Sequence, residues 1–290
     1  MVSFVDRHYG SPDGLRLHYR DYPGPAAGMP ALCIPGLTRN CRDFEDLAPR
    51  LARTRRVLAV DLRGRGDSDR DPDWKHYQPA TYLEDLRCLL DDAGVSRVVV
   101  VGTSLGGIMG MVMAACLPGV VAGLVLNDIG PEFGPEGIAR VNAYAGTIQP
   151  VTRWEDAASQ VKAVMAHAMP DFPDHDWVRV ARRMYRVQPD GTLVPDLDAG
   201  IATALRAGVG SSDVSLWTLF GAVRSLPVAV LRGELSDLLL PDTVRRMQEL
   251  KPDLITAVVP RRGHVPLLDE PESLAAIDAV VEAADAARRS

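Results

Sequence analysis

Short apolar runs, each bounded by turn residues, recur near the beginning of the chain and again toward its end. Runs of this length that are rich in β-branched residues are typical of buried strands, and apolar residues at helical spacing lie between them. Because strand and helix alternate from residue 31 to residue 127, the pattern predicts an α/β protein with a mostly parallel sheet and helices on both faces. Strands are expected at 15–19, 31–34, 57–60, 98–101, 120–126, 228–231 and 255–259, and helices at 43–53, 80–93, 106–116, 242–250 and 272–287.

The alternation stops after residue 128 and resumes near residue 228. Helical patterns replace it, with a turn at 189–191 that is compatible with one hairpin. The sequence therefore predicts an α/β core domain formed by 1–130 and 225–290, and an otherwise all-helical cap of residues 131–224 inserted after the strand at 120–126. This is the sixth strand when both strands of the first hairpin, which His8 and His18 flank, are counted. The helical patterns lie at 136–146, 154–169, 176–186 and 214–226.

One uncharged stretch, 98–126, is long enough to span a bilayer. Gly102 and the pair Pro118 and Gly119 interrupt it, which divides it into a strand, a turn, a helix and a second strand. We therefore expect a buried part of the sheet here and no membrane partner.

Composition sets further bounds. The chain has 290 residues, of which 47% are hydrophobic and 24% charged, so it is large enough to bury a substantial core. A net charge of −6 offers no sequence-wide basic field, and we expect no nucleic-acid partner. The composition is compatible with a monomer or a homodimer.

The termini and cysteines bear on the compartment. The first residues show neither an apolar segment nor a small-residue cleavage site, so the sequence predicts no signal peptide and a cytoplasmic protein. The cysteines lack the paired spacing of a zinc site, and we expect free buried thiols. They are Cys33, Cys41, Cys88 and Cys116.

The segment from Gly102 to Gly106 places Ser104 directly after the valine-rich strand and at the start of the next helix. A G-x-S-x-G sequence in this strand-turn-helix context is typical of a nucleophilic serine on a tight turn. A glycine-rich packing turn is the alternative interpretation. A serine hydroxyl becomes a good nucleophile only when a base takes its proton, so Ser104 requires an imidazole that is oriented by a carboxylate.

His264 is the predicted base, because it alone among the histidines lies on a loop after the last predicted strand. Asp237 follows the strand at 228–231 and gives the chain order Ser, Asp, His, so it is the predicted orienting acid. The alternative acids are Asp128, at the end of the preceding strand, and Glu234.

Together these features resemble the α/β-hydrolase fold over nearly the whole chain, with a helical cap. The matching motifs are Cys33 to Leu37, Asp61 to Ser68, Gly102 to Gly106, Gly233 to Asp237, and Gly263 with His264. The resemblance implies that the backbone N–H groups of Leu37 and Leu105 hold the oxyanion of the reaction.

Two departures from the family pattern stand out. The family often has His-Gly where this chain has Pro35 and Gly36, although the backbone donor that follows is retained. The acid commonly lies three residues after the glycine of its motif, whereas Asp237 lies four after Gly233. This extra residue keeps Asp128 open as the acid.

These residues predict a carboxylic ester hydrolase that forms an acyl-enzyme on Ser104 and acts on small to medium apolar esters, with lactones or oligoesters among the candidates. No metal or organic cofactor is expected. One alternative is a C–C bond hydrolase of vinylogous diketone acids, with Arg39 holding the carboxylate. Another is a ligand-binding receptor on the same fold. Candidate substrate contacts are Arg39, Asn40, Phe133, Tyr144, Trp154 and Trp177.

Overall fold

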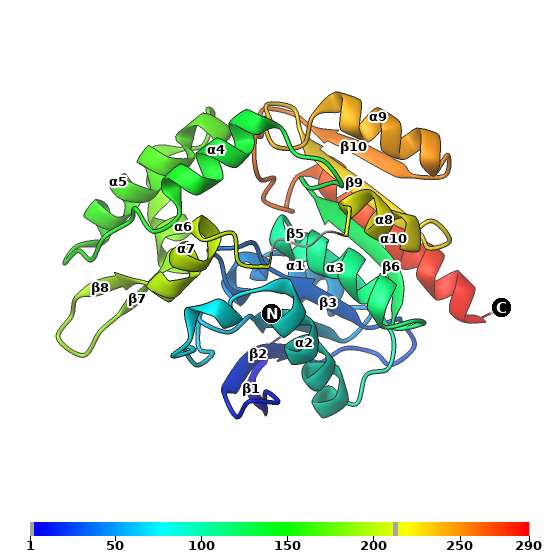
Figure 1. The fold of residues 1–290 in the computed structure, drawn as a ribbon, viewed down its shortest axis with the longest axis horizontal. Helices are drawn as coiled ribbons and strands as arrows, with labels where there is room; N and C mark the ends of the chain where they lie inside the picture. Colours follow the sequence, from blue (N-terminus) through cyan, green and yellow to red (C-terminus); the bar gives the residue numbers. More distant parts are fainter. Residues whose placement is uncertain (1–2, 211–213, 290) are drawn as a thin grey trace.

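An eight-stranded sheet forms the centre of the molecule (Figure 1). The computed structural model describes residues 3–210 and 214–289. The spatial order of the strands is β1-β2-β4-β3-β5-β6-β9-β10; β2 runs antiparallel to both of its neighbours, and the other adjacent pairs are parallel. The strands are β1 (Val5–Gly10), β2 (Arg16–Tyr22), β3 (Ala31–Ile34), β4 (Val57–Asp61), β5 (Val98–Thr103), β6 (Val121–Asn127), β9 (Val228–Gly233) and β10 (Ile255–Val259).

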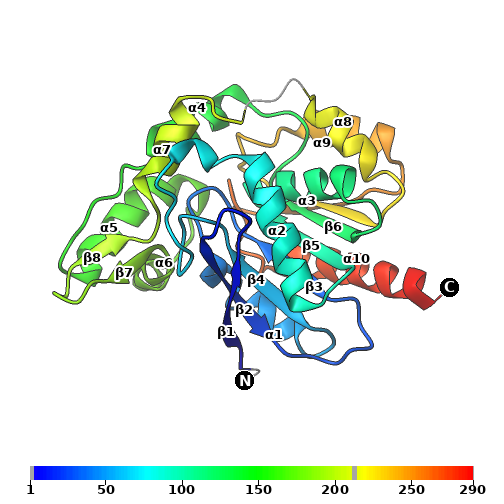
Figure 2. The same cartoon turned by 60° about the horizontal axis from the view of Figure 1, so that its bottom comes forward.

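Helices cover both faces of this sheet, which confirms the predicted α/β class (Figure 2). One face packs against α2 (Pro79–Ala93), α3 (Leu105–Cys116), α8 (Leu216–Ala222) and α9 (Pro241–Leu250), and the other against α1 (Leu47–Leu51) and α10 (Pro271–Arg289). The alternation along β5 explains how one strand serves both cores. Val98 and Val100 pack into the first cluster, whereas Val99 and Val101 pack into the second.

The cap lies over one end of the sheet, shown in green to yellow-green in Figure 1. It contains α4 (Pro135–Tyr144), α5 (Trp154–Met165), α6 (Trp177–Met184), the hairpin of β7 (Tyr185–Val187) with β8 (Leu193–Pro195), and α7 (Ala199–Arg206). The cap has its own apolar cluster, in which Val161 and Val180 are buried. The hairpin at the 189–191 turn means that the cap is not wholly helical.

Three details differ from the sequence-based expectations. In place of one helix at 43–53, the structure has a 3₁₀ helix at Cys41–Phe44 followed by α1. Pro49 has no N–H to donate to the carbonyl of residue 45, so a continuous α-helix would lack that hydrogen bond. The segment at 216–222, placed in the cap, packs as α8 on α3 of the core. Helix α7 was not predicted from the sequence.

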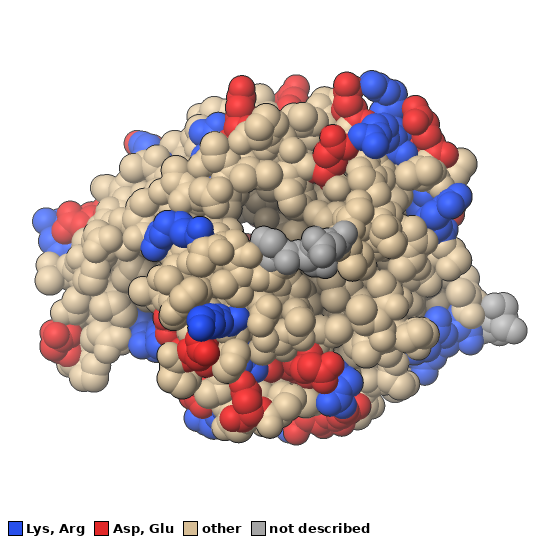
Figure 3. All heavy atoms as spheres, viewed as in Figure 1, with Lys and Arg blue, Asp and Glu red and all other residues tan. Residues whose placement is uncertain are grey.

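The remaining features concern the charged surface, the exposure of the cysteines and the apolar character of the helices. On the face in Figure 3, basic and acidic side chains are interspersed mainly toward the margin and the lower part, and a hollow near the centre is bordered largely by uncharged residues. Cys33 and Cys41 are buried as expected, but Cys88 is half-buried and Cys116 is exposed. Within residues 3–210 and 214–289, no helix has both the length and the apolar character that a membrane span requires.

Candidate active site

Ser104 occupies the sharp turn between β5 and α3, with φ 52° and ψ −115°. A non-glycine residue with positive φ is strained, and such strain persists only where the surroundings fix it. The glycines of the motif make the turn possible. A Cβ on Gly106 would lie 2.0 Å from the carbonyl oxygen of Ile34, and one on Gly102 would lie 2.3 Å from that of Gly106.

His264 extends from the loop after β10 toward this turn. Its Nε2 atom lies 3.0 Å from Ser104 Oγ, and its Nδ1 atom lies 2.8 Å from Asp128 Oδ2. The imidazole therefore links a hydroxyl on one side to a carboxylate on the other. This is the geometry that permits a serine proton to move to a histidine whose tautomer is fixed by an acid.

Asp128, and not Asp237, is the carboxylate that contacts His264. Asp128 follows β6, which is the direct neighbour of β5, and its side chain is 0% exposed. The expected contact between Asp237 and His264 is not formed. The Asp237 carboxylate instead accepts hydrogen bonds from Arg140 of the cap, with Nε at 2.9 Å.

The Asp128 carboxylate is held by two groups of the Gly233 to Asp237 motif, in which the sequence predicted the acid. The N–H of Gly233 donates to Oδ1 at 2.8 Å, and the hydroxyl of Ser236 donates to Oδ2 at 2.6 Å. Ser236 stands three residues after Gly233, where the resembled family commonly has its acid. A serine at that position was the signal in the sequence that another carboxylate contacts His264.

The two expected oxyanion donors come from two different segments, the start of α3 and the turn after β3. Leu105 begins α3, and Leu37 lies in a turn after β3 that the Arg39 N–H closes onto the Gly36 carbonyl. Both residues belong to the described chain, and neither backbone N–H donates a hydrogen bond within it. Both donors are thus available to an oxygen atom bound beside Ser104.

Arg65, which the sequence analysis did not single out, stabilises the Leu37 turn. Its side chain is wholly buried, and Nε donates to the Leu37 carbonyl at 2.7 Å. Nη1 donates to the carbonyl of Arg63 at 2.7 Å, and Nη2 to the hydroxyl of Tyr82 at 3.2 Å. Each nitrogen of this guanidinium therefore has an acceptor, which fixes the turn against the core.

A cavity of about 90 Å³ lies between the sheet and the cap and includes Ser104 and His264 in its wall. Its apolar lining comes from both domains: Leu37, Val141, Val164, Met165, Val180, Met184, Val265, Leu267 and Leu268. A cavity of about 150 Å³ holds a benzene molecule, so the present space suits a short acyl group. Arginine and aspartate side chains interrupt the apolar lining.

The candidate substrate contacts separate into two groups. Arg39 and Tyr144 line the cavity. Asn40 does not: it is buried, accepts from the Arg42 N–H and donates to the carbonyl of Arg183. The aromatic residues Phe133, Trp154 and Trp177 pack in apolar clusters, the first in the core and the other two in the cap.

Charge and burial act together on the two polar residues of the wall. Burial alone would lower the pKa of Arg39, but the Asp43 carboxylate outweighs it and raises that pKa. Burial raises the pKa of Tyr144, although the positive charge of Arg39 opposes the rise. At neutral pH the wall therefore presents a guanidinium and a protonated phenol.

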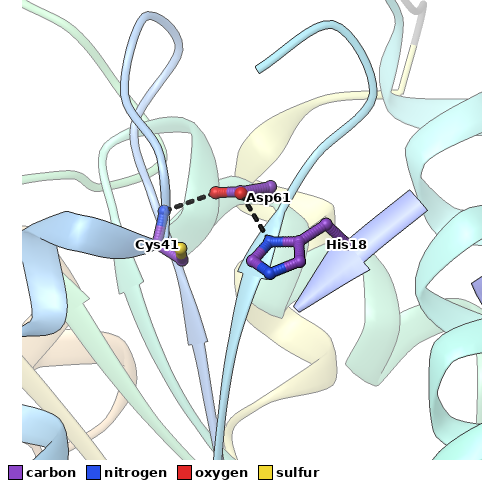
Figure 4. A group of neighbouring side chains, drawn as sticks. All are labelled: His18, Cys41 and Asp61. Atoms are coloured by element: carbon purple, nitrogen blue, oxygen red, sulfur yellow. Dashed lines mark hydrogen bonds and ion pairs between the residues drawn. The ribbon is translucent and has the colours of Figure 1, made fainter. Parts of the chain in front are cut away.

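A second group of titratable side chains lies apart from the cavity and consists of His18, Cys41 and Asp61, all buried (Figure 4). Asp61 accepts from His18 Nδ1 at 2.7 Å and from the backbone N–H of Cys41 at 2.6 Å. The other ring nitrogen of His18 lies 3.0 Å from Asp6. These atoms already satisfy one another, so the group connects β2, β4 and the 3₁₀ helix as a hydrogen-bonded network.

The chain is similar in sequence to known hydrolases. The model of the "Alpha/beta hydrolase family" matches residues 31–277. A 3-hydroxybutyrate-oligomer hydrolase from Cupriavidus necator is 31% identical, over 91% of this chain and 92% of its own length. A 2-(acetamidomethylene)succinate hydrolase from Mesorhizobium japonicum is also 31% identical, over 82% of each chain.

The chain is also similar to a solved structure over nearly its whole length. The crystal structure of an alpha/beta hydrolase from Novosphingobium aromaticivorans superimposes with a TM-score of 0.92 at 45% sequence identity. The alignment covers 97% of this chain and 99% of that one. The likeness therefore includes the cap as well as the sheet.

Proposed function

Because the chain belongs to the alpha/beta hydrolase family, we propose that it is a serine hydrolase that cleaves short-chain carboxylic esters. The observation that carries the proposal is the continuous hydrogen-bonded series from Ser104 through His264 to Asp128. Such a series activates a serine for attack on a carbonyl carbon.

In the proposed reaction, Ser104 Oγ attacks the ester carbonyl while His264 Nε2 takes its proton. Asp128 holds the proton on Nδ1 and stabilises the imidazolium that forms. The N–H groups of Leu37 and Leu105 stabilise the oxyanion, and loss of one such donor costs about 3 to 4 kcal/mol of transition-state stabilisation. His264 then protonates the departing alcohol, and water releases the acid from the acyl-enzyme by the same steps.

The cavity and the relatives support short substrates. A space of about 90 Å³ accommodates an acyl group of a few carbon atoms in the present arrangement of the cap. The similarity to a 3-hydroxybutyrate-oligomer hydrolase supports oligoesters of small hydroxy acids as substrates, because each repeat of such an oligomer adds only four carbon atoms.

A panel of p-nitrophenyl esters from acetate to decanoate tests this proposal. Activity is expected to peak near butyrate and to fall by about 10⁴-fold or more in Ser104→Ala. Ser159→Ala, which removes an exposed hydroxyl on α5, serves as the matched control and should behave like the wild type. Activity that survives Ser104→Ala would contradict the proposal.

The C–C bond hydrolase is kept as a second candidate because Arg39 does line the cavity, as that reaction would require. Diketone acids that bear a carboxylate distinguish the two candidates. If these compounds are cleaved and none of the p-nitrophenyl esters is, the ester hydrolase proposal is wrong.

A further inference from the structure

Arg39 has a nitrogen that nothing in its surroundings uses. Its Nε and Nη2 atoms donate to the two carboxylate oxygens of Asp43, at 2.8 and 2.5 Å. Its Nη1 atom is buried and has no hydrogen-bond partner within the described chain. A buried unpaired donor costs about 1 to 3 kcal/mol, and more when the group is charged, so its persistence beside a cavity calls for a ligand.

Arg39 is also close to the reactive serine. A Cβ atom built on Gly36 would lie 3.7 Å from Arg39 Cγ and 3.7 Å from Ser104 Cβ. Arg39 Cγ and Ser104 Cβ are therefore at most about 7.4 Å apart. A group bound by Arg39 would therefore share the cavity with the bond that Ser104 attacks.

Tyr144 supplies a second unused donor from the cap. It lines the same cavity, and among the residues that the structure describes its hydroxyl has no hydrogen-bond partner. Arg39 and Tyr144 line one cavity, and the positive charge of Arg39 opposes the rise in the pKa of the Tyr144 phenol. One donor comes from the loop after β3 and the other from α4, so the pair bridges the core and the cap.

The pairing of Arg39 with Asp43 leaves room for another carboxylate. Arg63, elsewhere in this chain, shows that one buried guanidinium can donate hydrogen bonds to several carboxylates. Its Nη1 atom donates to Asp13 and Asp71, while Nε and Nη2 donate to Asp85. Among the described residues, Arg39 contacts one acid, Asp43, through Nε and Nη2, and none through Nη1. A guanidinium in this state binds a further carboxylate through its free N–H groups.

We infer that Arg39 and Tyr144 form a binding site for a free carboxylate of the substrate. The substrates are then esters of short hydroxy acids whose carboxylate lies a few bonds from the scissile ester. In a 3-acyloxybutanoate, about 5 Å separate the carboxylate carbon from the ester carbonyl carbon, so one molecule can present its carboxylate to Arg39 and its ester carbonyl to Ser104 in the same cavity. The substrate class rests on the proposed ester hydrolysis, whereas carboxylate binding can be measured independently of it.

The experiment compares 3-(butanoyloxy)butanoate with the corresponding carboxamide, which has nearly the same shape and no charge. Calorimetric titration of both compounds into Ser104→Ala measures binding without turnover. The carboxylate is expected to bind about 10-fold more tightly or better, as for a charge-assisted hydrogen bond that replaces a neutral one. Adding Arg39→Gln should remove this preference, Arg39→Lys should restore part of it, and Tyr144→Phe should reduce it.

Arg50→Gln is the matched control, because Arg50 forms the same two-pronged contact with Asp278 and does not line the cavity. The preference should persist in this variant. Equal binding of the two compounds to Ser104→Ala overturns the inference, and this comparison needs no change at Arg39 that could impair folding. A preference that survives Arg39→Gln overturns it as well.

Hydrolysis by the wild-type protein separates this inference from the proposed function. If the carboxylate binds preferentially but neither this ester nor p-nitrophenyl butyrate is cleaved, the carboxylate site stands and the ester hydrolase proposal fails. If both esters are cleaved but binding shows no preference, the ester hydrolase proposal stands and the carboxylate site fails.

Discussion

Ser236 donates a hydrogen bond to the same oxygen of Asp128 that contacts His264, with Oγ to Oδ2 at 2.6 Å. The Ser236 hydroxyl also accepts the N–H of Leu239 at 3.1 Å. The loop after β9 thus fixes the orientation of a carboxylate that belongs to β6. Groups that orient a reactive side chain in this way affect its chemistry without touching the substrate.

Ser236→Ala should therefore lower kcat by about 10-fold with little change in KM, because one of the hydrogen bonds that fix the Asp128 carboxylate is lost. The free energy of unfolding should fall by about 1 to 2 kcal/mol, since the hydroxyl is buried. Steady-state kinetics with p-nitrophenyl butyrate and urea denaturation measure the two effects. An unchanged kcat would show that Gly233 alone suffices to hold Asp128.

Exchange of each candidate acid for its amide tests which one serves His264. Asp128→Asn should reduce kcat by about 10³- to 10⁴-fold, because an amide no longer fixes the imidazole in the required tautomer. Asp237→Asn weakens only the pair with Arg140 at the cavity wall and should change kcat by less than about 5-fold. The reverse order of effects would restore Asp237 as the acid.

The sequence was sufficient to locate β5, Ser104 and the helix that follows because these features are local. A valine run, a turn that only small residues permit and a run of small apolar residues are adjacent in the chain. The acid was not predictable in the same way. Its identity depends on which strand lies beside β5 and on where the loop after β9 ends, and these are tertiary relationships.

The substrate contacts show the same division. Trp154 and Trp177 at helical spacing fit a cavity wall and a cap core equally well from sequence, and the packing of α5 on α6 decides for the core. Asn40 follows Arg39 directly, yet the backbone directs one side chain into a helix cap and the other to the cavity. Sequence adjacency to the oxyanion turn does not reveal that difference.

Arg65→Lys should test whether the position of the Leu37 turn affects kcat beyond any loss of folding stability. Lysine keeps the charge but loses the planar fork that contacts three acceptors, so the Leu37 turn loses its fixed position. We expect kcat to fall by about 10-fold and the free energy of unfolding by about 2 kcal/mol. Arg55→Lys is the control: Arg55 is also buried and contacts Asp285 and a carbonyl away from the cavity. It should lose stability without losing kcat.

The pair of His18 and Asp61 predicts a pH window for stability (Figure 4). Burial alone would lower the pKa of His18, but the hydrogen bonds to Asp61 and Asp6 and the charges of Asp61 and Asp67 outweigh burial and raise it above the ordinary 6.5. Burial would raise the pKa of Asp61, but contact with His18 and two backbone N–H groups lowers it below 3.8. The folded state therefore favours the charged form of both partners.

Each shift fixes one edge of the window. The raised pKa of His18 contributes stability that is complete below pH 6.5 and is lost as the pH rises through the folded-state value. The lowered pKa of Asp61 contributes stability that is complete above pH 3.8 and is lost as the pH falls through its folded-state value. Between those limits His18→Gln should lose about 3 kcal/mol, as for a buried ion pair deprived of one partner.

Guanidinium denaturation of the wild type and His18→Gln at several pH values measures this difference. The difference should be largest between about pH 4 and pH 6.5 and should shrink toward pH 9, because a neutral His18 loses its attraction to Asp61. His175→Gln, at an exposed histidine of the cap, should match the wild type throughout. A difference that grows from pH 6 to pH 9 would mean that His18 is neutral in the folded protein, because a buried neutral histidine stabilises most at high pH.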